Sequence, residues 1–302
     1  MPLHDRSDDR ARHPLTAGPA PKRVLLTGAT GRVGGRIAPL LLHRGDQVRV
    51  LVRDTARGGP LAALGAEVVG GDLCDPAALR RAVDGMDAVV HLGAATGRDA
   101  TPERMASVNR DGAAALARAA LRAGAARFVF ASTYFVYGPG RGRPADEDDA
   151  LKPQGVYPSS KAAAEEALQD LYQRDGLGLR VLRFALVYGY GDPHLAESAA
   201  RIRTWPAHRR LHLVHHADAG QAVLRALDAD GVDGRAFNVG DDAPVTAAEV
   251  LRLHGRPLDP AAADRPLDDP WAGIVDTTRI RADLGFRPVF PTVYTAWSAG
   301  AW

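Results

Sequence analysis

Two side chains that can exchange protons stand four residues apart in the segment Tyr157-Pro158-Ser159-Ser160-Lys161. If this segment begins a helix, both side chains lie on one helix face about one turn apart. A free tyrosine loses its proton near about pH 10, so a neighbouring ammonium is needed to stabilise its phenolate for acid/base chemistry. The spacing therefore predicts a proton-transfer site in which Lys161 lowers the pKa of Tyr157.

Two hydroxyl side chains, Ser132 and Thr133, follow the apolar run Phe128–Ala131. Beside Tyr157, either hydroxyl would donate a hydrogen bond to a substrate carbonyl or alcohol oxygen and hold it in place. Hydroxyls at the end of a strand also cap the backbone that follows, which is the alternative role for Ser132. Both residues are candidates for the catalytic site.

A glycine turn near the N-terminus offers a place for a phosphate-bearing ligand. The turn Gly28-Ala29-Thr30-Gly31-Arg32-Val33-Gly34 follows an apolar run and precedes apolar residues at helical spacing. A dinucleotide pyrophosphate needs close backbone approach and a helix N-terminus whose free N–H groups favour negative charge. The pattern predicts a dinucleotide site, with a ligand-free tight turn as the alternative.

The elements that must position these groups alternate along the chain. We predict strands at 47–52, 67–70, 87–92, 127–131 and 179–183, and helices at 76–83, 102–123 and 157–175. This alternation predicts an α/β fold, a Rossmann-type doubly wound parallel sheet with a smaller, loop-rich C-terminal substrate lobe. We expect a disordered leader at 1–21, a dinucleotide-binding domain at 22–186 and the substrate lobe at 187–302. In that lobe only 221–228 and 246–253 show a helical pattern.

From about Arg23 to about Pro288 the chain resembles the extended short-chain dehydrogenase/reductases, the NAD-dependent epimerase/dehydratase family. The glycine turn and the Tyr157 to Lys161 segment carry the resemblance. Further motifs that fit are Gly71-Asp72-Leu73, His91-Leu92-Gly93-Ala94-Ala95, Ser132-Thr133-Tyr134-Phe135-Val136-Tyr137-Gly138 and Phe237-Asn238-Val239-Gly240.

The resemblance implies roles for individual residues. It makes Tyr157 the proton donor or acceptor and Lys161 its partner, which also binds the nicotinamide ribose. Counting back from Gly138 along the family's motif, the resemblance makes Thr133 the hydroxyl that donates to the substrate oxygen. The cofactor would further contact Asp72, Leu73, Leu92, Gly93, Ala94 and Asn109, and the substrate would contact Thr133, Tyr134, Ala185 and Leu186, although Leu186 replaces the family's usual asparagine.

The choice between NAD and NADP depends on what faces the adenosine ribose, where a carboxylate suits a free 2′-hydroxyl and an arginine suits a 2′-phosphate. Arg53 and Asp54 both stand after the second strand, and Arg32 and Arg57 are further guanidinium groups nearby. We favour NADP over NAD. The alternative is that these arginines are solvated surface groups.

Three functions remain open from the sequence. In the family's 4,6-dehydratases an Asp-Glu pair follows the catalytic threonine, and here Tyr134 and Phe135 occupy those positions. This favours net oxidation–reduction at a secondary alcohol or ketone of a sugar-like, nucleotide-sugar or natural-product substrate. The alternatives are an epimerase with tightly bound cofactor and a non-catalytic NADP-binding regulatory protein. Relatives of the regulatory type lose the Tyr-x-x-x-Lys pair that this chain keeps.

Composition narrows the possible partners. The 38 basic and 36 acidic residues are spread along the chain, which argues against nucleic acid binding. No apolar stretch approaches a membrane span, and we expect a cytoplasmic protein. The single cysteine, Cys74, rules out an internal disulfide. Because no paired carboxylate spacing accompanies His208, His212, His215 and His216, we predict no metal site. A homodimer built through 102–123 and 157–175 is the expected assembly.

Overall fold

The computed structural model describes residues 20–97 and 100–302, so most of the predicted leader at 1–21 lies outside the described residues. Its strands are β1 (Arg23–Thr27), β2 (Gln47–Val52), β3 (Glu67–Gly70), β4 (Ala88–His91), β5 (Arg127–Thr133), β6 (Leu179–Phe184), β7 (Leu186–Tyr188), β8 (Arg210–Leu211), β9 (Leu213–His215), β10 (Arg235–Val239) and β11 (Val245–Thr246).

The helices are α1 (Gly34–His43), α2 (Gly59–Ala63), α3 (Pro76–Val83), α4 (Pro102–Met105), α5 (Ala113–Arg122), α6 (Val156–Asp175), α7 (His194–Ile202), α8 (His216–Asp228), α9 (Ala247–Leu253), α10 (Thr278–Asp283) and α11 (Val293–Ser298). The short helices η1 (Thr55–Gly58), η3 (Tyr134–Tyr137) and η4 (Pro260–Ala263) are of the 3₁₀ type, and η2 (Ala106–Gly112) is a π-helix.

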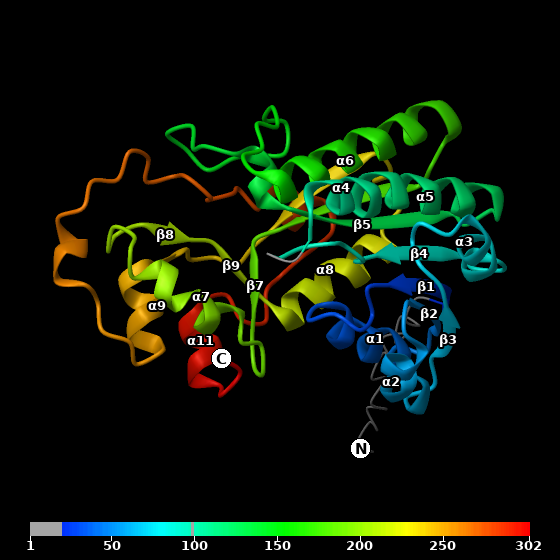
Figure 1. Ribbon diagram of the computed structural model, residues 1–302, viewed down its shortest axis with the longest axis horizontal. Coiled ribbons are helices and arrows are strands. Elements are labelled where there is room, and N and C mark those ends of the chain that lie inside the picture. Colours follow the sequence, from blue (N-terminus) through cyan, green and yellow to red (C-terminus); the bar gives the residue numbers. More distant parts are fainter. Residues whose placement is uncertain (1–19, 98–99) are drawn as a thin grey trace, which may run out of the picture.

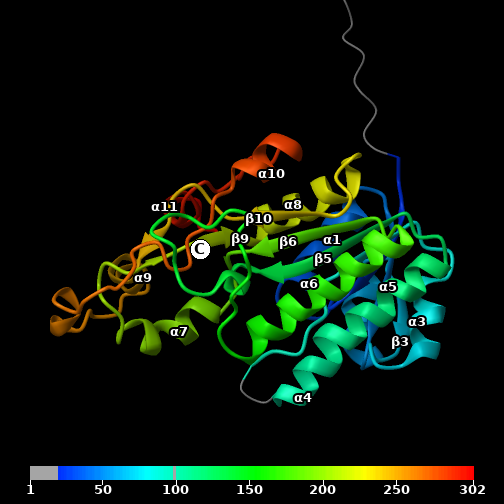
Figure 2. The ribbon, with the colours of Figure 1, turned by 90° about the horizontal axis from the view of Figure 1, so that it is seen from above.

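Within the described residues, seven parallel strands form the main sheet in the order β10-β6-β5-β4-β1-β2-β3. The order reverses direction beside β1 and β4, which is the doubly wound arrangement expected from the sequence. Helices cover both faces of this sheet (Figures 1 and 2). The predicted fold class is confirmed.

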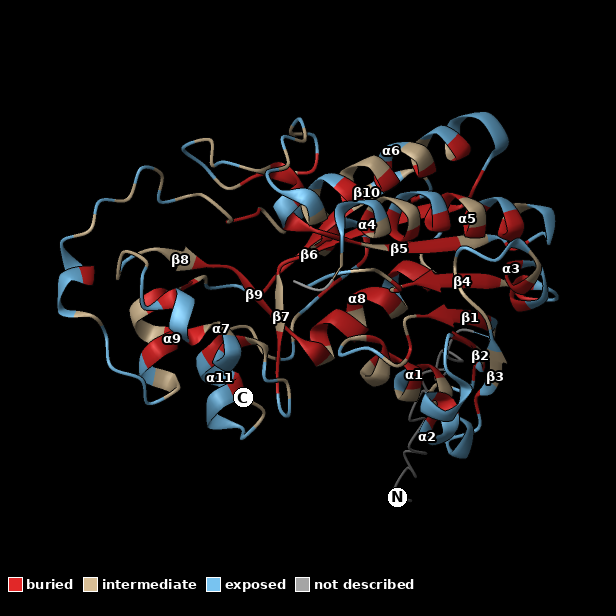
Figure 3. Cartoon of the chain, viewed as in Figure 1, coloured by how far each residue is buried: buried red, intermediate tan, exposed pale blue. Residues whose placement is uncertain are grey.

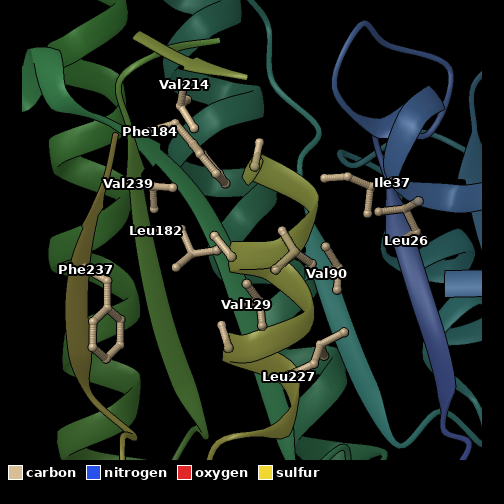
Figure 4. Packing of buried hydrophobic residues seen from close by; sticks show 14 of the residues in the cluster. Leu26, Ile37, Val90, Val129, Leu182, Phe184, Val214, Leu227, Phe237 and Val239 are labelled. Atoms are coloured by element: carbon tan, nitrogen blue, oxygen red, sulfur yellow. The ribbon is translucent and has the colours of Figure 1, made fainter. Parts of the chain in front are cut away.

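Alternate residues of the central strands face opposite helical layers, because successive side chains of a strand point to opposite faces. Leu26, Val90 and Val129 pack with α1 and α8, as Figure 4 shows for the cluster around α8. Leu25 and Val89 face α3, α5 and α6 instead. Since both faces are covered, β4 and β6 are buried along their whole length (Figure 3).

A smaller lobe gathers α7, α9, α11 and the short strands β8 and β11 around its own apolar cluster, at the left of Figure 1. Three elements beyond residue 187 lie outside this lobe's apolar cluster, and one of them is α10, whose Ile280 is buried with the main sheet. α8 packs on the main sheet and β10 pairs with β6 at its edge. After residue 187 the chain therefore passes between the lobe and the main sheet more than once.

The structure also contains helices that the periodicity did not indicate. α7, α10 and α11 lie in the proline-containing second half, and the predicted helix at 102–123 is divided into α4, η2 and α5. In the part of the chain that the structure describes, no helix is both long and apolar enough to span a membrane.

Candidate active site

The predicted site residues gather at the carboxyl edge of the sheet, where β1, β4 and β5 end at Thr27, His91 and Thr133. In open α/β sheets this edge, beside the point where strand order reverses, is where ligands bind. The glycine turn leaves β1 here, and α6 begins here with Tyr157 in its first turn. The fold thus brings together segments that are distant in the sequence.

The glycine turn is packed so tightly that side chains would not fit. A Cβ at Gly34 would lie 2.2 Å from the carbonyl oxygen of Gly28, and a Cβ at Gly28, whose φ is +73°, would lie 2.6 Å from the backbone nitrogen of Gly93. The turn closes through a hydrogen bond from the Gly31 N–H to the Gly28 carbonyl at 3.0 Å. It leads into α1 with Val33 at the N-cap. This cradle, with the free N–H groups of a helix start, fits a dinucleotide pyrophosphate.

The loop after β4 is fixed against the glycine turn by Thr27. The Gly93 N–H donates to Thr27 Oγ1 at 3.2 Å, and Thr27 Oγ1 lies 2.6 Å from His91 Nδ1. Burial, followed by the Lys161 ammonium, lowers the pKa of His91 to about 3, so the imidazole is neutral. The backbone of Leu92 and Gly93 therefore lies directly against Gly28 of the cradle, and Ala94 follows them in the chain.

Near the predicted site of the adenosine ribose, the protein has both basic and acidic side chains. Arg53 is exposed, whereas Asp54 caps η1 by accepting from the Ala56 N–H at 3.0 Å. Arg57 donates to the Thr30 carbonyl at 3.3 Å. Arg32 points to the second lobe instead, where its guanidinium lies 2.9 Å from Glu197.

Asp72 and Leu73 follow β3 at the same edge. The Asp72 carboxylate accepts from the Cys74 N–H and from Arg104, each at 2.9 Å, and these contacts lower its pKa although burial opposes them. Leu73 approaches Gly93 and Gly112 closely, since a Cβ on either glycine would lie 3.1 Å from the leucine side chain. Cys74 is an exposed free thiol.

Tyr157 and Lys161 begin α6, as predicted. Lys161 is 2% exposed and its Nζ lies 4.1 Å from the centre of the Phe130 ring. Burial lowers the pKa of Lys161 to about 7, against the opposing effect of Glu165. Burial also raises the pKa of Tyr157 to about 12, which is opposite to the direction expected from the sequence. The phenol is therefore protonated at neutral pH and is ready to donate a proton.

The two hydroxyls at the end of β5 make different contacts. Thr133 caps η3, with its Oγ1 accepting from the Phe135 N–H at 3.4 Å. Ser132 donates to the buried carboxylate of Glu165, so it does not cap the strand end. Tyr134 is buried and stacks on Phe135 with ring centres 4.2 Å apart.

Asn109 links the loop after β4, which contains Ala95, to the start of α6. Its Oδ1 accepts from the Ala95 N–H at 2.7 Å, and its Nδ2 donates to the Ala95 carbonyl and to Ser160 Oγ, each at 2.9 Å. Ser160 in turn donates to the Tyr157 carbonyl at 2.8 Å. Asn109 is placed by the π-helix η2, a deviation from α-helix that often occurs at functional sites.

The predicted substrate side is lined by both lobes. Ala185 is buried and Leu186 half-buried where the chain leaves β6. Beyond them, the guanidinium groups of Arg201 and Arg209 lie 5.6 and 4.3 Å from the Trp205 ring centre. A small pocket beside Tyr134 is lined by Trp271, Gly273 and Arg141 as well.

The histidines at 212–216 take part in separate contacts. His212 Nε2 lies 3.1 Å from the Asp241 carbonyl, His215 Nε2 lies 2.9 Å from the Ala301 carbonyl, and His216 Nε2 lies 2.8 Å from Asp192. Among the described residues no group of three or more metal-binding side chains converges.

The buried ion pair that begins one helical turn after Lys161 on α6 was not predicted from the sequence. Glu165 and Arg183 form an ion pair with Nη2 and Oε2 2.7 Å apart, and Ser160 supports Tyr157. One signal was present: Glu165 follows Lys161 by four residues and so shares its helix face.

Residues 24–240 match the family described as "NAD dependent epimerase/dehydratase family". A dTDP-glucose 4,6-dehydratase of Streptomyces niveus is 30% identical, with 88% of each chain covered. A 3-diazoavenalumate denitrifying reductase of a Streptomyces species is 32% identical and covers 89% of this chain and 97% of its own. The solved DesIV, a dTDP-glucose 4,6-dehydratase from Streptomyces venezuelae with NAD and TYD bound, has a TM-score of 0.76 at 25% identity and covers 92% of this chain and 95% of its own.

The glycine cradle, the loop after β4 and the start of α6 meet at one edge of the sheet, and the family match spans all three segments. The chain belongs to the NAD-dependent epimerase/dehydratase family.

Proposed function

We propose that this protein is an NAD(P)-dependent oxidoreductase that reduces a ketone, or oxidises the matching secondary alcohol, with Tyr157, Lys161 and Thr133 as its catalytic residues. The observation that carries the proposal is the buried Lys161, four residues after a tyrosine whose phenol keeps its proton, at the edge that holds the glycine cradle. Membership of the family supports the same class of chemistry.

In the direction of reduction, the protein's part is to hold an oxygen and supply a proton. A bound nicotinamide supplies the hydride. The Thr133 hydroxyl donates a hydrogen bond to the substrate oxygen, and the Tyr157 phenol gives that oxygen its proton. The Lys161 ammonium then stabilises the phenolate that remains until a proton returns from solvent. Ser132 is the adjacent hydroxyl, and its bond to Glu165 favours Thr133 as the substrate contact.

We infer NADP as the preferred cofactor. Arg53 is exposed beside the predicted ribose site, and Asp54 Oδ1 accepts a hydrogen bond from the Ala56 N–H as a helix cap. A guanidinium in this place suits a 2′-phosphate. NAD is the alternative, and the NAD bound to the related DesIV structure supports it.

The substrate proposal is a sugar-like ketone or alcohol, with a nucleotide sugar as the leading class. Related proteins named as dTDP-sugar enzymes support this class. Net redox chemistry is favoured over dehydration, because buried Tyr134 and exposed Phe135 stand where a 4,6-dehydratase needs an acid and a base. The aromatic groups Tyr134 and Trp271 favour a natural-product ketone as the second class, consistent with the diazoavenalumate reductase among the relatives.

The experiment is a titration with NADPH and NADH, followed by absorbance of the reduced nicotinamide in the presence of nucleotide sugars and of hydrophobic ketones. We expect tighter binding of NADPH and its consumption with one substrate class. A cofactor that co-purifies without net consumption, while a sugar changes configuration, would identify an epimerase instead. Cofactor binding with neither reaction would favour the non-catalytic regulatory function.

A further inference from the structure

A third ionisable side chain continues the helix face that carries Tyr157 and Lys161. Glu165 follows Lys161 by four residues on α6, as Lys161 follows Tyr157, so the three project from one face on successive turns. Glu165 is 6% exposed and Lys161 is 2% exposed. A carboxylate so deeply buried is costly unless it has partners.

Two strands of the sheet supply those partners. Arg183 of β6 donates from Nη2 to Glu165 Oε2 at 2.7 Å and from Nε at 3.1 Å. Ser132 of β5, the residue before Thr133, donates its hydroxyl to Glu165 Oε1. These hydrogen bonds fix the carboxylate, and one of them comes from the strand that carries Thr133.

The charges around Lys161 show what this carboxylate can do. From α6, Glu165 favours the ammonium form of Lys161. From β4, neutral His91 adds no charge, and from β5 the Phe130 ring lies 4.1 Å from Lys161 Nζ. From β6, Arg183 pairs with Glu165 and also donates to Tyr137 Oη at 2.8 Å and to the Glu147 carbonyl at 3.2 Å.

We propose that Glu165 is a positioning residue whose buried carboxylate, one helical turn from Lys161 and held by Arg183 and Ser132, favours the ammonium form of Lys161. This inference rests on the proposed function for its catalytic consequence, since Lys161 must be charged to stabilise the Tyr157 phenolate. Without Glu165, burial alone acts on Lys161 and the ammonium loses its proton at lower pH.

The test uses the small number of lysines in this chain. Only Lys22, Lys152 and Lys161 are present, so protein labelled with ¹³C at the lysine Cε gives three signals, and the Lys161→Met variant assigns the third. We expect Glu165→Gln to lower the Lys161 titration midpoint by about one pH unit or more. The matched control is Glu166→Gln, at the exposed neighbouring position, which should leave the midpoint unchanged.

Glu165→Gln leaves Arg183 buried without its partner, so a second variant guards against misfolding. The double variant Glu165→Gln/Arg183→Met removes both charges of the pair, and it should shift the Lys161 midpoint in the same direction. If either variant folds with an unshifted Lys161 midpoint, Glu165 serves packing alone and the proposal is overturned.

Kinetics provide the second readout. In the direction of reduction, the alkaline limb of kcat should move to lower pH in Glu165→Gln, because both Lys161 and Tyr157 must be protonated. A uniform loss of kcat with an unmoved limb would contradict the proposal. The lysine titration needs no substrate, so an enzyme inactive on every substrate would defeat the proposed function while the Glu165 result still stands or falls by itself.

Discussion

Replacing Asn109 by alanine should remove the hydrogen bonds that connect the loop after β4 with the helix that carries Tyr157. Asn109 is fully buried and makes three hydrogen bonds, two to the backbone of Ala95 and one to Ser160. Alanine fills part of the space but offers no polar atom. The Ala95 N–H and carbonyl and the Ser160 hydroxyl would then lose their partner inside the protein.

The magnitude follows from these contacts. A buried hydrogen bond contributes about 0.5–1.5 kcal/mol net, so three of them correspond to about 1.5–4.5 kcal/mol of unfolding free energy. The lost hydrogen bonds all lie between one loop and the start of one helix, so the structural change is expected to be local. We therefore expect weaker cofactor binding and a lower kcat in addition to reduced stability, because both the loop after β4 and the Tyr157 backbone lose their support.

Asn238→Ala is a matched control. Asn238 is also fully buried and also makes three hydrogen bonds through its side chain, to Tyr137, Ala145 and Asp276, away from the glycine cradle. Urea denaturation should show a similar loss of stability for both variants, whereas the NADPH dissociation constant should rise only for Asn109→Ala. Equal NADPH affinity in the two variants would refute the coupling role of Asn109.

Three further predictions concern the cradle, the cofactor and a buried carboxyl group. Gly34→Ala should weaken NADPH binding by more than about tenfold, because its Cβ meets the Gly28 carbonyl at 2.2 Å; Gly35→Ala, with its nearest contact at 3.5 Å, should bind normally in the same fluorescence titration. Arg53→Glu should weaken NADPH binding by about tenfold or more and leave NADH nearly unchanged, and equal losses for both would disprove 2′-phosphate recognition. Burial raises the pKa of Asp241 to about 8. The folded protein therefore keeps a proton on this carboxyl group that the unfolded chain releases at about pH 4. Its contribution to stability is therefore lost as the pH rises towards 8, and Asp241→Asn should flatten that decline in urea midpoints measured at pH 5 and pH 8.

Much of the fold was predictable because the sheet is buried on both faces. The strands predicted at 87–92 and 179–183 correspond to β4 and β6, which are buried along their whole length, and each predicted bound lies within one residue of the observed one. The return of α8 and β10 to the main sheet was not predictable from periodicity, since local pattern does not show which sheet a strand joins. α7 and α11 were missed because prolines and glycines surround short helices that are stabilised by the second lobe's own core.

The candidate site was predictable where spacing alone determines geometry. Tyr157 and Lys161 share a helix face by the helical repeat, and the glycine turn follows a strand. The pKa of Tyr157 was predicted in the wrong direction, because the extent of burial depends on tertiary packing. The Glu165–Arg183 pair joins a helix to a strand 18 residues later, and its pairing is likewise a property of the packed structure.

The central claim is that Tyr157 supplies a proton during hydride transfer, and a comparison of wild-type protein with Tyr157→Phe tests it most directly. Both proteins are titrated with NADPH, and consumption of NADPH is then followed with the substrate that the wild type reduces. We predict equal NADPH affinity and a fall in kcat of about 10²–10⁴-fold for the variant. An unchanged kcat in Tyr157→Phe would contradict the claim.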